Sequence, residues 1–173
     1  MTELKAAADK VSLEADVLID MAEAAVSEPE RVCFVCTGNT CRSPMAAAVL
    51  NHLGKPYGIT ACSGGIAPNI GEPVCANAVT ALLDAGIEPS DGNRFDLHTA
   101  RLIDEEMIMS SSRVVCMTES HMFALIGAFP QYISKFRVMP HPISDPFGGD
   151  IARYEGCLRE LTDGICEMFR FDN

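Results

Sequence analysis

The amino-acid sequence predicts an α/β domain. Short apolar runs rich in valine, isoleucine and cysteine alternate with longer segments of helical periodicity. The apolar runs lack strict polar alternation, as expected for parallel strands covered on both faces. With 173 residues, the chain suffices for one domain with a full core and is too short for two. We therefore expect a three-layer α/β/α sandwich around a four-stranded parallel sheet, doubly wound and flavodoxin-like, with an extra N-terminal helix.

The first half of the chain supplies the extra helix and two strands. Residues 1–30 form an acidic helical extension with one apolar stripe, and residues 31–173 form the domain. Arg31–Cys36 is a buried strand that stops at a turn-rich segment. A helix follows from Ser43, with proline in its first turn, and it ends at Gly54. The run Ile59–Ser63 is the second strand candidate.

The second half repeats this alternation. The polar stretch Pro89–Asp96 is an exposed loop, after which we expect a strand pattern to resume. The expected elements are a helix at Val74–Ala85, a strand at Arg113–Met117, a helix at Glu119–Ala128, a weaker strand at Lys135–Met139 and a last helix at about Asp150–Phe169. We expect Met107, Met109, Met117 and Met122 to pack in the core. Ligands of such a sheet bind at the carboxyl ends of its strands.

Charge and composition exclude several classes of protein. A formal net charge of -11 repels nucleic acid and anionic lipid, so we expect neither as a partner. The composition is that of a folded protein, and no run is long and apolar enough for a membrane span. The N-terminus does not resemble a secretory signal. The eight cysteines lie in apolar segments, and most of them are expected to be reduced and buried, consistent with a cytoplasmic protein.

One segment carries most of the chemical information. Cys36 and Arg42 are separated by five residues in a loop between a buried strand and a helix N-terminus. Backbone amides and the helix dipole make such a loop a nest for a tetrahedral oxyanion, and Arg42 can grip two of its oxygens. The same positive field favours the nucleophilic thiolate of Cys36. The residues expected to bind the anion are Thr37, Gly38, Asn39, Thr40, Cys41 and Ser43.

A second segment offers a proton donor. Asp145 follows the fourth strand, so its loop would overhang the same crevice as Cys36, and Pro146 stiffens the turn. Asp-Pro is by itself most often a plain turn, and a random cysteine and arginine at this spacing are most often structural. The three groups together favour a phosphocysteine enzyme in which Asp145 is the general acid.

These motifs resemble the low-molecular-weight protein tyrosine phosphatase family. CTGNTCRSP, the turn at Ser63–Gly65, His98–Arg101, the strand at Val114–Met117 and Asp145-Pro146 occur in the family's order. The resemblance runs from about residue 31 to 169 and implies a phosphatase domain acting on phosphorylated proteins, releasing inorganic phosphate with no metal or other cofactor. It implies that Cys36 attacks phosphorus, Arg42 and the loop amides bind the phosphoryl group, and Asp145 protonates the leaving group and then activates water. Gly64 departs from the alanine typical of the family.

Two positions bear on the substrate. Many tyrosine phosphatases of the family have isoleucine in place of Thr40, and two aromatic residues where this chain has Phe147 and Gly148. Threonine followed later by DPFGG resembles the bacterial protein arginine phosphatase branch. A hydroxyl can hydrogen-bond a guanidinium group, and Phe147 can stack on it or on a phenol ring. Phosphoarginine is slightly favoured, and phosphotyrosine is the alternative.

The remaining candidates have supporting roles or belong to rival functions. Cys41 is either a partner for a protective, reversible disulfide with Cys36 or an inert small residue. His98 resembles a family position that braces the loop asparagine. An arsenate reductase would use Cys116 and a second cysteine a few residues later, which is missing. A non-catalytic phosphate-binding module would not need Asp145. His52, His121 and His141 share no ligand spacing with nearby cysteines, so no metal site is expected; the oligomeric state remains open.

Overall fold

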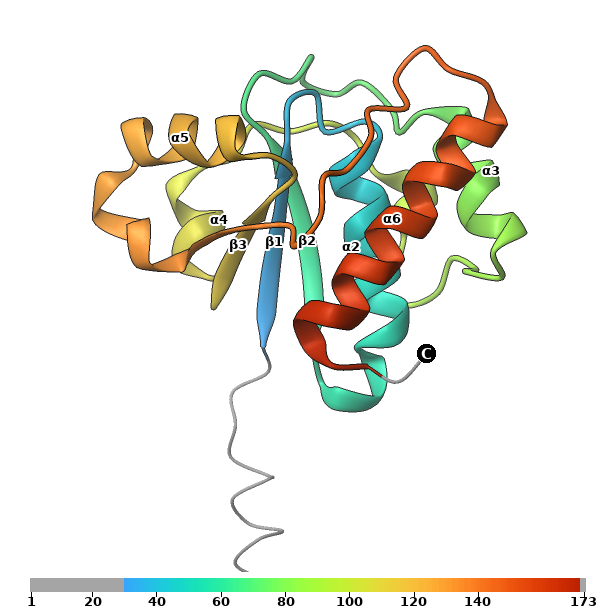
Figure 1. The fold of residues 1–173 in the computed structure, drawn as a ribbon, viewed down its shortest axis with the longest axis horizontal. Helices are drawn as coiled ribbons and strands as arrows, with labels where there is room; N and C mark the ends of the chain where they lie inside the picture. The colour runs from blue at the N-terminus through green and yellow to red at the C-terminus, as the bar shows by residue number, and fades with distance from the viewer. Residues whose placement is uncertain (1–29, 172–173) are drawn as a thin grey trace, which may run out of the picture.

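The sheet has the topology that the sequence predicts. The structure, a computed structural model, describes residues 30–171. Its strands are β1 (Arg31–Cys36), β2 (Thr60–Gly65), β3 (Arg113–Cys116) and β4 (Phe136–Val138). They are all parallel and lie in the order β2-β1-β3-β4, which confirms the doubly wound α/β fold (Figure 1). The helix expected over residues 1–30 lies outside the described residues, apart from its last position.

Helices cover both faces of this sheet. The first group comprises α2 (Arg42–Leu53), α3 (Ala76–Asp84) and α6 (Ile151–Phe169), which pack together on one face. The second group, α4 (Glu105–Met109) and α5 (Glu119–Ala128), lies on the other (Figure 1). Strand β1 serves both layers because its side chains alternate between the two faces. Phe34 packs in the cluster with α2 and α6, whereas Val35 packs with α4 and α5.

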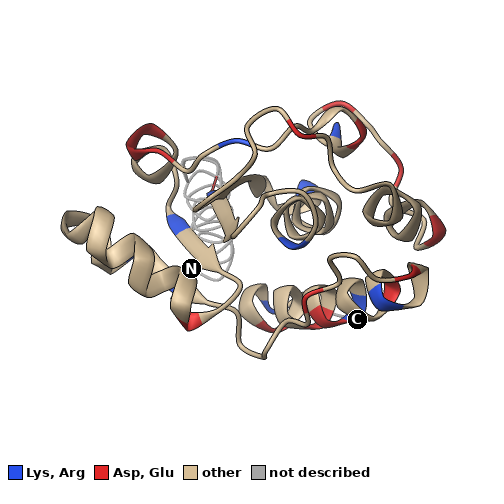
Figure 2. Cartoon of the chain, turned by 90° about the horizontal axis from the view of Figure 1, so that it is seen from above, with Lys and Arg blue, Asp and Glu red and all other residues tan. Residues whose placement is uncertain are grey.

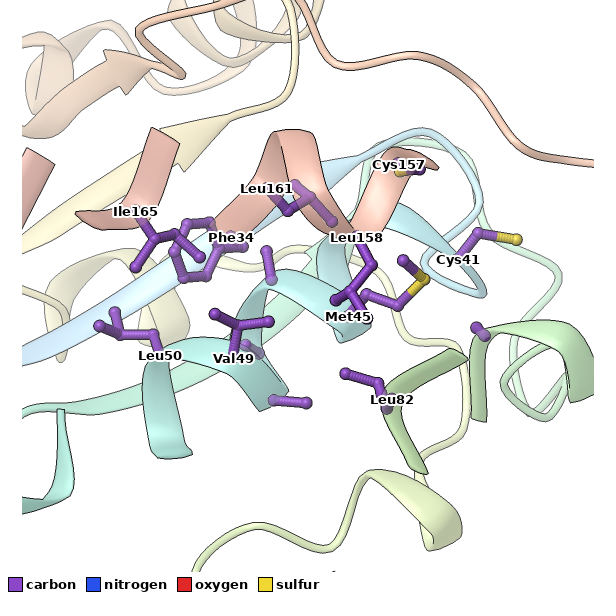
Figure 3. Close-up of a cluster of buried hydrophobic side chains, with 14 of the residues drawn as sticks. Phe34, Cys41, Met45, Val49, Leu50, Leu82, Cys157, Leu158, Leu161 and Ile165 are labelled. Atoms are coloured by element: carbon purple, nitrogen blue, oxygen red, sulfur yellow. The ribbon is translucent and has the colours of Figure 1, made fainter. Parts of the chain in front are cut away.

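The larger core cluster holds α2 and α6 in place at the end of β1. Phe34, Met45 and Leu161 are completely buried where the two helices face each other above the sheet (Figure 3). Burial of each such side chain contributes about 1.5–3 kcal/mol. Since β1 runs directly into the loop that precedes α2, this packing fixes both ends of that loop. The loop between β1 and α2 is therefore held by rigid elements on both sides.

The structure differs from the sequence prediction between residues 95 and 110. The stretch Pro89–Asp96 is not exposed throughout, because Asn93 and Phe95 are buried in it. A 3₁₀ turn (Phe95–Leu97) and the short helix α4, which the sequence did not predict, come before the strand pattern resumes at β3. The carboxylate of Asp104 caps α4 by accepting from the amide of Met107 at 2.8 Å. Because α4 is little more than one turn, it buries Met107 but leaves Met109 61% exposed. The expectation that Met109 packs in the core is wrong.

The other boundaries agree with the prediction within two residues, and β1 and α5 agree at both ends. All eight cysteines are free thiols, and all but Cys75 are buried. Over residues 30–171, no helix combines the length and the apolar character that crossing a membrane requires.

Candidate active site

The loop between β1 and α2 turns sharply at Asn39. This residue has a φ of 56°, in the left-handed region that asparagine tolerates better than most side chains. Helix α2 begins at Arg42, and the preceding Cys41 offers no side-chain cap to its first amides. Uncapped amides at a helix N-terminus remain available to an anion. The loop's sequence therefore gives it the geometry of an anion cradle.

Asn39 also fastens the loop to its neighbours. Its Nδ2 donates to Ser43 Oγ at 2.9 Å and to Ser63 Oγ at 3.0 Å, and its Oδ1 accepts from the amide of Arg101 at 3.0 Å. The carbonyl of Asn39 accepts from Nε2 of His98 at 3.0 Å. Asn39 is completely buried, so these bonds replace those that water would make. They tie the loop to β2 and to the segment before α4.

Cys36 is the last residue of β1 and lies at the base of this loop. Its Sγ is 2.9 Å from Ser43 Oγ and accepts from the amide of Asn39 at 3.2 Å. A hydroxyl oxygen and a backbone amide therefore lie next to the same sulfur atom, and the hydroxyl also lies 3.4 Å from the carbonyl oxygen of Gly64. Donors in this arrangement stabilise negative charge on a thiolate, both before it attacks and when it departs.

Arg42 and Asp145 meet above the loop. Nη2 of Arg42 donates to Oδ2 of Asp145 at 2.6 Å, although the two residues are 103 positions apart. The Arg42 side chain is 9% exposed, whereas that of Asp145 is 53% exposed. The loop after β4 thus brings Asp145 to the crevice that contains Cys36, as its position after the fourth strand predicts.

The segment after Asp145 forms a tight turn. The carbonyl of Pro146 accepts from the amide of Gly149 at 2.9 Å, and Gly148 between them has a φ of 72°. Glycine suits this conformation, and an aromatic residue at position 148 would be strained. The turn leaves Phe147 68% exposed at the rim of the crevice. Many tyrosine phosphatases of the family have a second aromatic residue where this chain has Gly148. The positive φ of this turn is a local backbone reason for glycine at that position.

A cavity of about 310 Å³ joins these groups. Its wall includes Cys36, the whole loop up to Arg42, Asp145 and Phe147. Ser43 is not among the lining residues, but its Oγ contacts the sulfur of Cys36. The other lining residues, which sequence analysis did not identify, are Ala67, Asn69 and Glu72. They follow Ser63–Gly65, which the sequence predicted as a turn but which forms the end of β2. No motif marks these lining residues, because their position at the cavity depends on how the segment after β2 folds back.

Two histidines support the loop from outside the cavity. Burial lowers the pKa of His98 below its usual value, with the hydrogen bond to Asn39 opposing this shift. His121 is 4% exposed, and its Nε2 lies 2.9 Å from Thr37 Oγ1 while Nδ1 lies 2.6 Å from Thr118 Oγ1. Burial, and secondly the charge of Arg42, lower the pKa of His121. Sequence analysis considered His121 only as a metal ligand and missed this position beside the loop.

The remaining cysteines lie in two different environments. Cys41 Sγ is 2.9 Å from Sγ of Cys75 and 3.4 Å from the hydroxyl of Tyr154. Cys116 is completely buried in β3, where burial raises its pKa to about 12, so it is poorly suited to a redox relay.

No group of three or more histidine, cysteine or acidic side chains arranged to hold a metal ion occurs within residues 30–171.

Comparison with known proteins agrees with this geometry. Residues 31–170 match the family described as low molecular weight phosphotyrosine protein phosphatase. A protein-arginine-phosphatase of Geobacillus stearothermophilus is 34% identical over 152 residues, covering 82% of this chain and 97% of that protein.

Two solved structures are similar over the same range. The YwlE arginine phosphatase of Geobacillus stearothermophilus superposes with a TM-score of 0.72 at 33% identity, covering 82% of this chain and 94% of that one. A low molecular weight protein tyrosine phosphatase from T. tengcongensis gives a TM-score of 0.73 at 33% identity, with coverages of 82% and 98%. The chain belongs to the low molecular weight protein tyrosine phosphatase family and is a cysteine-dependent protein phosphatase.

Proposed function

We propose that this protein hydrolyses phosphorylated protein side chains through a phosphocysteine intermediate at Cys36, with phosphoarginine as the preferred substrate. The observation that carries the proposal is the convergence of three groups on one cavity. Cys36 Sγ lies at its base, and the Arg42–Asp145 pair spans its wall with a separation of 2.6 Å. A module that only binds phosphate would need the cradle and the arginine, but not the carboxylate.

In the first step the Cys36 thiolate attacks phosphorus, and the bond from phosphorus to the side-chain leaving atom breaks. The loop amides and Arg42 bind the phosphoryl oxygens, where negative charge accumulates in the transition state. Asp145 donates a proton to the leaving nitrogen or oxygen, so arginine departs with its guanidinium restored and tyrosine departs as a neutral phenol. In the second step the same carboxylate takes a proton from water, which attacks the phosphocysteine. Inorganic phosphate leaves, and Ser43 Oγ stabilises the returning thiolate from 2.9 Å.

The preference for phosphoarginine rests on the hydrogen-bond acceptors around the cavity. A guanidinium presents several N–H donors, whereas the ring of phosphotyrosine, whose oxygen carries the phosphoryl group, presents none. Thr40 lines the cavity, and its hydroxyl has only a 3.6 Å contact with the weakly interacting sulfur of Cys41. Glu72 contributes a carboxylate to the cavity lining, where it accepts from Nδ2 of Asn69 at 3.2 Å. Phe147 offers a flat face on which a guanidinium can stack.

Overall identity does not separate the two substrates, because an arginine phosphatase and a tyrosine phosphatase are both 33% identical to this chain in their solved structures. The test is therefore turnover of matched phosphoarginine and phosphotyrosine peptides by the wild type, Thr40→Ile and Glu72→Gln, with Cys36→Ser as a blank. Glu106→Gln removes a carboxylate from α4, outside the cavity lining, and serves as the matched control.

We expect the wild type to prefer phosphoarginine, and both rim variants to lose kcat/KM for that peptide while Glu106→Gln does not. Loss of one charge-assisted hydrogen bond corresponds to about 1.5–3 kcal/mol, or roughly a 10- to 150-fold change in kcat/KM. A wild-type preference for phosphotyrosine that Thr40→Ile leaves unchanged would make the protein a tyrosine phosphatase and Thr40 a space-filling residue.

The acid is tested separately with Asp145→Asn. We expect its kcat to fall by about 10²–10⁴ with a smaller change in substrate binding, because a positioned general acid contributes about that factor. A kcat close to that of the wild type would reject the role of Asp145, whichever substrate is preferred.

The setting of this activity also follows from the cysteines. We infer a cytoplasmic protein, because eight free thiols suit a reducing compartment.

A further inference from the structure

A pair of thiols lies behind the phosphate-binding loop and takes no part in the proposed mechanism. Sγ of Cys41 is 2.9 Å from Sγ of Cys75, and the hydroxyl of Tyr154 on α6 is 3.4 Å from Cys41 Sγ. Cys36, by contrast, directs its sulfur to Ser43 Oγ and to the amide of Asn39. We propose that Cys41 and Cys75 form a reversible disulfide when the protein meets hydrogen peroxide.

The backbone already holds the two segments in the required register. The amide of Cys75 donates to the carbonyl of Thr40 at 2.9 Å, so the residue before Cys41 is bonded directly to Cys75. Cys75 stands immediately before α3, which packs with α2 and α6 in the larger core cluster. A disulfide has a sulfur–sulfur distance of about 2.0 Å, so the pair must approach by only about 0.9 Å. Small side-chain rotations supply this movement.

The two thiols have different roles in the reaction. Cys41 is 5% exposed, and burial together with the contact to Cys75 raises the pKa of its thiol to about 12. A protonated, buried thiol reacts slowly with peroxide, so within this pair the first oxidation falls on the partly exposed Cys75. The peroxide O–O bond breaks, Cys75 becomes a sulfenic acid, and one water is released.

The second step closes the disulfide. The sulfur of Cys41 attacks that of Cys75, the S–O bond of the sulfenic acid breaks, and the S–S bond forms. The Cys41 proton leaves with the oxygen as a second water, and the adjacent Tyr154 hydroxyl can relay it. Overall, two thiols lose two electrons and two protons, and one hydrogen peroxide becomes two waters.

This pairing changes the role expected for Cys41. A protective disulfide with Cys36 requires that Cys41 be available to the nucleophile. With Cys75 already at 2.9 Å, Cys41 has a competing partner outside the cavity. The inference does not depend on whether the substrate is phosphoarginine or phosphotyrosine, and it is tested without measuring turnover.

The experiment treats the folded wild-type protein with one equivalent of hydrogen peroxide, blocks remaining thiols and maps disulfides after trypsin. Cys41 falls in the peptide 32–42 and Cys75 in the peptide 43–94, because proline follows Lys55 and prevents cleavage there. A Cys41–Cys75 disulfide therefore joins two peptides, whereas a Cys36–Cys41 disulfide stays within one. Fragment ions separate Cys41 from Cys33 and Cys36, and Cys75 from Cys62.

We expect the Cys41–Cys75 cross-link as the major product in the wild type, and its release by dithiothreitol. The cross-link should persist in Cys36→Ser and in Cys166→Ser, which removes a thiol on α6 and serves as a control. It should disappear in Cys75→Ser, where Cys41 becomes available to Cys36. A wild type that forms only the Cys36–Cys41 disulfide, or none, would overturn the proposal. Loss of the cross-link in Cys36→Ser would also overturn it, by showing that the nucleophile is oxidised first. Circular dichroism of each variant checks that it is folded.

Discussion

Asn39 offers the most direct test of how the phosphate-binding loop is held. Its buried side chain donates twice, to Ser43 and Ser63, and accepts once, from the amide of Arg101. Its φ of 56° adds a conformational demand that alanine meets poorly. The replacement Asn39→Ala therefore removes three hydrogen bonds and introduces backbone strain at one position, without touching Cys36, Arg42 or Asp145.

The expected loss of stability follows from these contacts. A typical hydrogen bond contributes about 1 kcal/mol net, so three of them contribute about 3 kcal/mol. Alanine in the left-handed region costs about 1 kcal/mol more, which gives a total of about 4 kcal/mol. Asn93 is a matched control, since it is also buried and its side chain makes one hydrogen bond, from Nδ2 to the carbonyl of Ala48 at 3.0 Å. Asn93→Ala should cost about 1 kcal/mol by the same reasoning.

The assay is urea unfolding of the wild type and both variants, with m-values compared to verify two-state behaviour. We expect Asn39→Ala to lower the free energy of unfolding by about 3 kcal/mol more than Asn93→Ala does. We also expect Asn39→Ala to lower kcat, because Ser43 loses the amide that orients its hydroxyl toward Cys36. If the two variants are equally destabilised, the Asn39 network does not hold the loop and our reasoning about it is wrong.

Further predictions concern backbone contacts and pH. Gly65→Ala should lower the free energy of unfolding by about 1–3 kcal/mol and should also lower kcat. The reason is that the new Cβ would lie 2.6 Å from the carbonyl oxygen of Thr37 in the loop. Unchanged unfolding and turnover curves would contradict this close approach. Gly148→Ala should destabilise by about 1 kcal/mol through its φ of 72°, with nothing within 4 Å of the new Cβ, and calorimetry measures the loss. Burial lowers the pKa values of His98 and His121, so the unfolded state binds protons first as pH falls. The neutral forms of the two histidines contribute stability that is fully present above about pH 6.5 and is lost as pH falls toward the lowered pKa values. Urea unfolding between pH 7 and 5 should therefore show a falling free energy of unfolding. His98→Asn and His121→Asn should make this fall smaller.

The sequence predicted the sheet well because each strand is an apolar run with a clear boundary. RVCFVC ends at a glycine and asparagine turn, and because both faces are packed, every residue after the exposed Arg31 is apolar and buried. Helix α5 is bounded by a threonine that caps its first turn and a proline after its end, so both boundaries are local signals. Helix α4 was missed because a helix of one turn has too few residues for a periodic pattern, although its cap Asp104 is visible in hindsight.

The candidate site likewise contains residues that the sequence predicts and residues that it does not. Cys36, Arg42 and Asp145 could be identified because a contiguous motif and an Asp-Pro turn mark them. Glu72, His121 and Cys75 could not, because each reaches the loop only through tertiary contacts. Cys75 is 34 residues from Cys41, and nothing in the spacing of the eight cysteines distinguishes this pair from the others. Residues that support or surround a site are specified by packing, which a local pattern does not encode.

The charge distribution shows how an acidic protein can still bind a phosphoryl group. Figure 2, which looks onto the molecule from above, has acidic segments spread over peripheral helices and loops, in keeping with the net charge of -11. At the cavity, Arg42 and the loop amides supply the attraction, while Asp145 and Glu72 lie beside them. The attraction of the cradle is screened within about 8–10 Å at physiological salt. A polyanion that extends beyond this distance is repelled by the acidic surface. The proposed preference for phosphoarginine agrees with this arrangement, because a phosphoryl group attached to a cationic guanidinium complements both the Arg42 cradle and the carboxylate of Glu72.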